Sequence, residues 1–160
     1  MARKGQKSTR HSKITAEYSE ALILYWLSKS GCECAKLDHT GIDLIARVPS
    51  LEKKPIGISV KSRSRFNQKR GDSMNIEVAG MTKATKACDS FGCIPYYAIV
   101  IDEDGLTYAF LLSLKKLQAL FPKGKRVRVW EMHQRFLARY KLDPEILMFT
   151  DKHESIGWVN

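Results

Sequence analysis

An aspartate and a lysine at the ends of two short apolar segments are the residues of this sequence whose types and spacing suit chemistry. Asp43 opens the segment 43–48, and Lys61 follows the segment 56–60. A polar turn, 49–55, separates the segments, so we expect an antiparallel hairpin with strands about 4.8 Å apart. Such a hairpin brings Asp43 and Lys61 to the same end. A carboxylate and an ammonium there can hold a divalent metal ion and a phosphate side by side.

Two runs of basic residues accompany this pair. The first begins at Lys61 and continues without an acid until Asp72; its other members are Arg63, Arg65, Lys69 and Arg70. The second is the segment 1–13, which has no acid and no large apolar side chain and carries Arg3, Lys4, Lys7, Arg10 and Lys13. We expect 1–13 to be a flexible basic arm that gains affinity for a nucleic-acid backbone by releasing counterions. The alternative is purely structural: an Asp that caps a strand, a solvated Lys and a solubilising tail.

Composition narrows the class of partner. The chain has 160 residues with 27 Lys or Arg against 17 Asp or Glu, a formal net charge of +10. This length suits one domain, 14–160, and the charge favours a polyanionic partner such as nucleic acid. No segment is long and apolar enough to span a membrane, and the N-terminus lacks the apolar core of a signal peptide, which predicts an intracellular, cytoplasmic protein without a membrane partner.

The elements that must position Asp43 and Lys61 follow from the hydrophobic pattern. We expect helices at 15–30, 82–91, 113–121 and 131–140, further strands at 32–37, 76–78, 96–101, 106–112 and 125–130, a polar loop at 61–75 and an irregular tail from 143. Glu20 stands beside the apolar face of the first helix, from which it can point towards a neighbouring sheet. The core is predicted at about 14–112, with 113–160 as a C-terminal extension of unassigned role.

Four cysteines allow two interpretations. Cys32 and Cys34 are separated by one residue, and Cys88 and Cys93 by four, so neither pair has the usual spacing of a zinc knuckle. Cys34, Cys88 and Cys93 lie in apolar surroundings, where a free cysteine packs as a small hydrophobic residue. The sequence favours buried thiols and leaves structural zinc as the alternative.

The order helix, strand, strand, short strand, helix, strand resembles the PD-(D/E)xK nuclease superfamily, and within it the archaeal Holliday-junction resolvases. The resemblance covers roughly residues 4–112. It depends on the KG near the N-terminus, Glu20 followed eleven residues later by Gly31, Ile42–Asp43, the segment ISVK at 58–61 and FGCIPYYAIVI at 91–101. It implies an α/β, restriction-endonuclease-like fold in which helices flank a central mixed sheet.

The resemblance also implies roles for individual residues. Asp43 would be the metal-binding aspartate, Lys61 the catalytic lysine, Glu20 a helix carboxylate near the metal, and the Val60 carbonyl a further ligand of Mg²⁺ or Mn²⁺. The family's second acid, two residues before the lysine, falls on Ser59. Three accounts stay open: Glu77 or Glu20 replaces that acid, Ser59 serves through a water molecule, or the site is inactive.

The resulting hypothesis is a magnesium-dependent endonuclease that binds double-stranded or branched DNA. The resemblance to the resolvases also implies a homodimer, because two sites are needed to cut both strands. The first alternative is a catalytically inactive nucleic-acid-binding protein on the same fold, motivated by Ser59. A second is an RNA-binding or ribosome-associated basic domain, which only the net charge supports.

Overall fold

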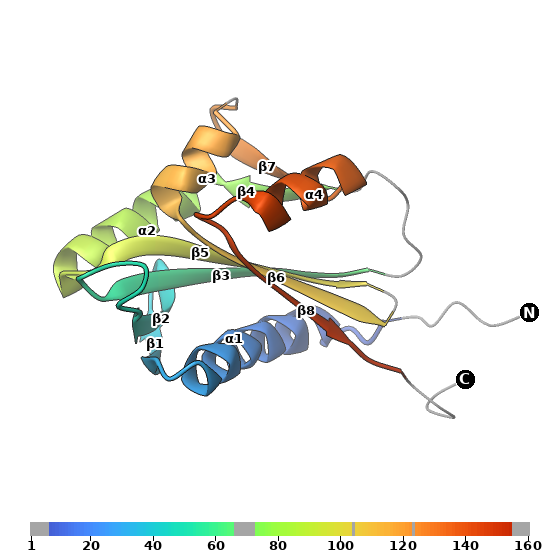
Figure 1. Ribbon diagram of the computed structural model, residues 1–160, viewed down its shortest axis with the longest axis horizontal. Coiled ribbons are helices and arrows are strands. Elements are labelled where there is room, and N and C mark those ends of the chain that lie inside the picture. Colours follow the sequence, from blue (N-terminus) through green and yellow to red (C-terminus); the bar gives the residue numbers. More distant parts are fainter. Residues whose placement is uncertain (1–6, 66–72, 104, 123, 155–160) are drawn as a thin grey trace, which may run out of the picture.

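A six-stranded mixed sheet forms the centre of the computed structural model, which describes residues 7–65, 73–103, 105–122 and 124–154. Its strand order is β1-β2-β3-β5-β6-β8, and a separate two-stranded sheet pairs β4 with β7. Helix α1 covers one face, while α2, α3, α4 and the small sheet lie over the other (Figure 1). The elements are α1 His11–Lys29, β1 Glu33–His39, β2 Ile42–Arg47, β3 Ile56–Arg65, β4 Ser73–Glu77, α2 Val78–Phe91, β5 Ile94–Glu103, β6 Leu106–Ser113, α3 Leu114–Leu120, β7 Val127–Glu131, α4 Gln134–Leu142 and β8 Leu147–Lys152.

The sheet is mixed because α2 makes a crossover between β3 and β5, which run parallel along ten residue pairs. The other neighbouring strands pair antiparallel, including the β2–β3 and β5–β6 hairpins that the sequence predicts. Parallel strands require such a crossover, and their burial on both faces explains the continuous apolar run in β5. The expected central mixed sheet flanked by helices is therefore confirmed.

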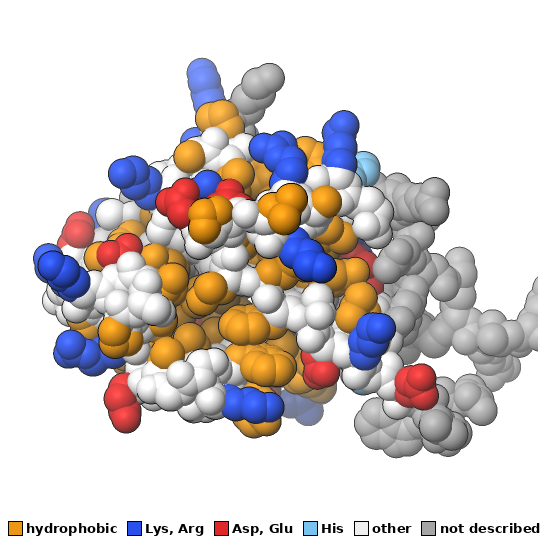
Figure 2. Space-filling model, viewed as in Figure 1, with side chains coloured by type: hydrophobic (Ala, Val, Ile, Leu, Met, Phe, Trp, Pro, Cys, Tyr) orange, Lys and Arg blue, Asp and Glu red, His pale blue; other side chains and the backbone are white. Residues whose placement is uncertain are grey.

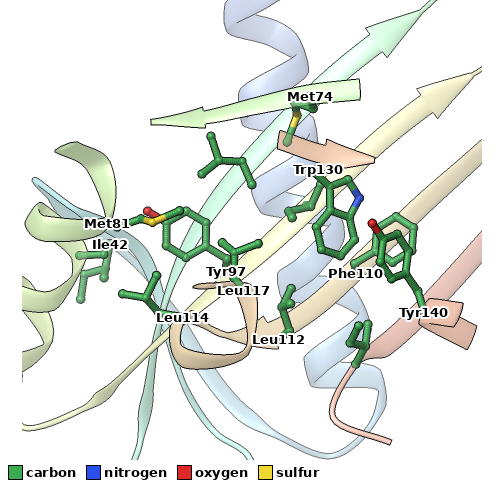
Figure 3. Close-up of a cluster of buried hydrophobic side chains, with 14 of the residues drawn as sticks. Ile42, Met74, Met81, Tyr97, Phe110, Leu112, Leu114, Leu117, Trp130 and Tyr140 are labelled. Carbon is green, nitrogen blue, oxygen red and sulfur yellow. The ribbon is translucent and has the colours of Figure 1, made fainter. Parts of the chain in front are cut away.

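Each face of the sheet has its own apolar core. On the α1 face, Ile23 and Leu27 pack against residues such as Ile58 and Val100. On the opposite face, Trp130 and Tyr140 stack with their ring centroids 4.2 Å apart and pack on Phe110 of β6 (Figure 3). Residues beyond 113 thus supply part of the second core.

Several element boundaries differ from the expected ones. Helix α1 begins at His11, so 11–13 of the expected arm are helical, and α2 begins at Val78, four residues earlier than expected. The expected loop 61–75 was wrong at both ends, because β3 continues to Arg65 and β4 begins at Ser73. Pairing with β5 holds the polar end of β3 in the sheet, and a pattern of side-chain polarity does not reveal such pairing.

The expected irregular tail is also wrong. Residues 147–152 form β8, which pairs antiparallel with β6 and becomes an edge of the main sheet. The expected strand at 125–130 appears as β7, but Arg128 does not face outwards: it is partly buried and donates a hydrogen bond to the Phe121 carbonyl at 3.0 Å. Within the described residues, no helix is long and apolar enough to cross a membrane.

Candidate active site

Asp43 lies where β2 and β3 separate. The ladder of pairs between these strands ends at Leu44 and Ile58, so Asp43 and Ser59 are the next residues opposite each other. The Val60 N–H, which lies beyond that last pair, donates a 2.7 Å hydrogen bond to Asp43 Oδ2. We call this place, made by Asp43, Ser59, Val60 and Lys61, the fork. Within the described residues Asp43 makes no ion pair, and its side chain is held by the backbone of β3.

The pKa of Asp43 shows which of the predicted site residues lie near its carboxylate. Burial raises the pKa of Asp43; the Val60 N–H and the positive charge of Lys61 act against this rise, whereas the negative charge of Glu20 adds to it. The net pKa stays above the ordinary value. Asp43 thus lies within electrostatic reach of both Lys61 on β3 and Glu20 on α1, as the sequence predicts.

Lys36 is a fourth charged residue at the fork, and sequence reasoning missed it. It lies on β1 opposite Leu44, and its Nζ is 2.7 Å from Glu20 Oε2. The hydrogen bond to Glu20 raises the pKa of Lys36, and its charge also helps to keep Asp43 ionised. Nothing in the sequence marks Lys36, because only the register of β1 on β2 brings it beside Glu20.

Ser59 brings no negative charge to the fork. It is 3% exposed and pairs in register with Tyr97 of β5, which is fully buried. Burial raises the pKa of Tyr97 to about 12, although the nearby Ser59 hydroxyl favours the phenolate. Among the described residues, the Tyr97 hydroxyl has no hydrogen bond of normal geometry. The position that the sequence resemblance assigns to a second acid is thus neutral and enclosed.

Glu77 does not join the fork. It ends β4 in the small sheet, where it pairs with Val127, and its side chain is exposed. The groups that shift the pKa of Asp43 include Glu20 but not Glu77. In the described part of the chain, no three His, Cys, Asp or Glu side chains are arranged to hold a metal ion. The available donor set is therefore two carboxylates, Asp43 and Glu20. Mg²⁺ is commonly held by one or two carboxylates together with waters and substrate phosphates, so this set fits it.

The predicted phosphate-binding residues have different surroundings. Arg63 is exposed and its Nη1 donates to the Ser73 carbonyl at 2.7 Å, whereas Arg65 forms a buried ion pair with Glu103 at 3.0 Å. The Arg65 side chain is 9% exposed, so its charge is largely used inside the protein. The rest of the predicted set divides into Lys7, Arg10 and Lys13, which lie at or before the first turn of α1, and Arg3, Lys4, Lys69 and Arg70, which lie outside the described residues.

A polar groove lies next to the fork, between the start of α1 and the second half of β3. Its volume is about 380 Å³. Lys7 reaches across it to hydrogen-bond the Ser64 carbonyl. The lining residues are Lys7, Ser8, Thr9, His11, Ser12, Thr15, Ser62, Arg63 and Ser64. Hydroxyls and the Lys7 ammonium suit a phosphodiester backbone that continues from the fork.

The four cysteines do not converge. Cys88 and Cys93 lie together against Gly57, and burial followed by the contact with Cys93 raises the pKa of Cys88 to about 12. Cys32 and Cys34 pack on the core of the opposite, α1 face. Such surroundings are those of unreactive, packed thiols.

The raised pKa of Asp43 predicts that wild-type protein and the Asp43→Asn variant differ in stability, and that the difference depends on pH. Because the folded protein holds this proton more tightly than the unfolded chain, wild-type stability falls as pH rises from the ordinary value of 3.8 to the raised pKa. The Asp43→Asn variant cannot ionise, so it does not lose stability in this way. Its amide oxygen can still accept the hydrogen bond from the Val60 N–H. We expect the variant to unfold at higher urea concentration than wild type at pH 7, with the difference vanishing below pH 3.8. Urea titrations across this range measure it. Asp38→Asn, at an exposed position on β1, is the control; an equal gain there would contradict the explanation.

Comparisons with known proteins support the fold. No protein-family model matches the chain, and no curated protein matches it. Among solved structures, it is similar to a Holliday junction resolvase from the archaeal hyperthermophile Archaeoglobus fulgidus, with a TM-score of 0.52 and 13% sequence identity. The match covers 75% of this chain and 84% of the resolvase. The chain has the restriction-endonuclease-like, mixed α/β fold of that protein.

Proposed function

We propose that this protein binds DNA and hydrolyses a phosphodiester bond at the fork with Mg²⁺ or Mn²⁺. The observation that supports this most directly is the position of Asp43: its carboxylate is held by the Val60 N–H, beside Lys61 and within electrostatic reach of Glu20. Asp43 is partly buried and makes no ion pair within the described residues, and carboxylates with raised pKa values of this kind are concentrated at functional sites.

Each residue has a defined part in this proposal. Asp43 and Glu20 hold the metal ion, which supplies a polarised phosphate and an activated water molecule when bound. The Val60 N–H fixes one carboxylate oxygen of Asp43 and leaves the other for the ion. The Val60 carbonyl remains a proposed ligand, as the family resemblance implies. Lys61 places a compact positive charge where negative charge develops on the phosphate.

Lys36 controls how strongly the fork binds a metal ion. Its ion pair with Glu20 balances one of the two carboxylates, so the charges of Asp43, Glu20, Lys36 and Lys61 cancel at the fork. A metal ion therefore binds best together with a DNA phosphate, which supplies the missing negative charge and oxygen ligands. We expect weak metal binding by the protein alone and stronger binding in the presence of DNA.

The substrate that we propose is double-stranded or branched DNA. The structural neighbour is a resolvase of Holliday junctions, and the net charge of +10 suits a duplex backbone. We extend the proposal to a homodimer, because one fork can cut only one strand at a time.

A cleavage assay tests the activity. Labelled linear, nicked and four-way-junction DNA would be incubated with wild-type protein and Mg²⁺, Mn²⁺ or Ca²⁺. We expect cleavage with Mg²⁺ or Mn²⁺ and a loss of at least about 100-fold in Asp43→Asn, because the variant removes a charged ligand. Asp38→Asn should cleave as wild type does. Cleavage that is unchanged in Asp43→Asn would show that the fork is not the active site.

A second candidate is DNA binding without cleavage. Ser59 favours it, because a buried neutral hydroxyl stands where the family has an acid. This function predicts binding that weakens steeply with salt and no product with any divalent ion. A product that appears with wild type and disappears in Asp43→Asn would exclude it.

A further inference from the structure

The segment that follows β6 carries a large excess of positive charge. Residues 114–145 contain nine Lys or Arg against three Asp or Glu, so they carry six of the ten excess positive charges. Figure 2 shows Lys and Arg side chains gathered over the part of the molecule where α3 and α4 lie. The exposed cations that we call the α4 surface are Lys125, Arg126, Arg135, Arg139 and Lys141.

The acids of this segment are used locally and leave the α4 surface positive. Lys116 Nζ holds Asp143 at 2.8 Å and Glu145 at 2.9 Å. Glu131 faces His133 at 3.3 Å. By contrast, the α4 surface makes no ion pair with any residue that the structure describes.

An aromatic ring supports two of the guanidinium groups. Arg135 lies over the Phe136 ring at 5.0 Å from its centroid, and Arg139 lies over the same ring at 5.6 Å. The residues are one helical turn apart, so both guanidinium groups are held on one side of α4. Cation–π contacts restrict their rotamers, which lowers the entropy lost when a ligand binds. Guanidinium forks suit phosphate oxygens in particular.

The α4 surface is connected to the fork through the small sheet. Ile58 is buried in the core on the α1 face, and Val60 packs against that core. Lys61 and Arg63 alternate with these residues, so they project from the opposite face of β3, which the small sheet covers. Arg63 hydrogen-bonds the Ser73 carbonyl at the start of β4, and Ser73 pairs with Glu131 at the end of β7. Helix α4 begins three residues after Glu131. A strand of DNA at Arg63 is thus close to the start of the α4 surface.

We propose that the α4 surface is a second contact surface for the DNA backbone, which extends the binding site from the fork over the C-terminal segment. This inference rests on the proposed DNA binding and assigns a role to a segment that contains no residue of the fork. The partner is the phosphate backbone of a duplex, read without regard to base sequence.

Binding measurements with two matched triple variants test the inference. Arg135→Ala/Arg139→Ala/Lys141→Ala removes three charges of the α4 surface. Arg47→Ala/Lys53→Ala/Lys54→Ala removes three exposed charges at the turn between β2 and β3, on another part of the molecule. Affinity for a fluorescent 30-base-pair duplex would be measured by anisotropy between 50 and 300 mM salt, with EDTA present to prevent cleavage. Thermal melting would establish that both variants are folded.

The two variants lose the same number of charges, so a difference in their DNA affinity must come from where those charges lie. Each lost phosphate contact lowers the slope of log affinity against log salt by about 0.9, so we expect a decrease of about 2 to 3 for the α4 variant and at least a tenfold loss of affinity at 100 mM salt. The control should lose less than about threefold. Equal losses would attribute the effect to net charge, and an unchanged α4 variant would place the DNA elsewhere; both outcomes overturn the inference. Wild-type protein that binds no DNA would overturn the proposed function itself.

Binding to anionic lipid vesicles provides a further check, because a cationic helix face also attracts lipid headgroups. Wild-type protein and the α4 variant would be sedimented with phosphatidylserine vesicles. We expect no difference between them at 150 mM salt. An α4 variant that loses vesicle binding and keeps its DNA affinity would identify a lipid surface as the partner and overturn the inference.

Discussion

Replacing Gly41 with alanine is expected to destabilise the protein by about 3 kcal/mol or more, since it combines backbone strain with a close contact. Gly41 has φ +105°, a conformation that residues with a side chain rarely adopt. A Cβ at this position would lie 2.4 Å from the Lys83 carbonyl oxygen and 2.5 Å from its carbon. Both atoms belong to the backbone of α2, so neither can move aside alone. Urea unfolding at pH 7 measures the loss.

Gly92→Ala is the matched control for this prediction. Gly92 ends α2 with φ +67°, but a Cβ there meets no atom of the described residues within 4 Å. The control therefore has the backbone strain without the contact, and we expect a loss of about 1 to 2 kcal/mol. Equal losses in the two variants would mean that α2 does not approach the turn before Asp43 as closely as described.

The Gly41 contact also shows how the fork is kept in place. The turn between β1 and β2 ends two residues before Asp43, and α2 rests directly on it. A variant that folds with α2 displaced should therefore lose the proposed cleavage activity as well as stability. The glycine that the sequence shows before Asp43 is thus a packing requirement for α2 in addition to a turn former.

The parts of the fold that depend on local pattern could be predicted from the sequence. The hairpin of β2 and β3 and the position of Asp43 beside Lys61 follow from two apolar segments and a polar turn. Strand β8 could not be predicted, because the polar residues at its end pair only with β6, a partner about forty residues away. The polar end of β3 was assigned to a loop for the same reason: its partner is β5.

The residues of the candidate site likewise fall into those that the sequence could predict and those that it could not. Asp43, Lys61 and Glu20 carry signals of type and spacing, and the structure brings them within electrostatic reach. Lys36 and Tyr97 reach the fork through the register of neighbouring strands, which no local pattern encodes. Glu77 was a candidate to replace the missing acid, but it ends β4 in the small sheet, where it pairs with Val127.

Ser59→Glu is expected to convert the fork into a stronger metal site. Ser59 follows the Leu44–Ile58 pair beside Asp43, so the new carboxylate would adjoin Asp43. Without a metal ion, mutual repulsion and the enclosed position should lower the thermal midpoint relative to wild type. Mg²⁺ should restore it, because an ion that binds the folded state stabilises it by about 2.7 kcal/mol at a concentration 100 times its Kd. Thermal melting with 0 to 20 mM Mg²⁺ measures both effects.

Two further variants separate charge from size in this experiment. Ser59→Gln has the volume of the glutamate without its charge, so it should be destabilised and should not respond to Mg²⁺. Ser59→Glu/Tyr97→Phe removes the neighbouring hydroxyl, which has no normal hydrogen bond among the described residues, and should ease the crowding without weakening the response to the ion. If Ser59→Glu responds to Mg²⁺ no more than Ser59→Gln does, the side chain at 59 does not face the metal. In that case the proposed metal site would consist of Asp43 and Glu20 alone, without a donor at the position that the sequence resemblance assigns to a second acid.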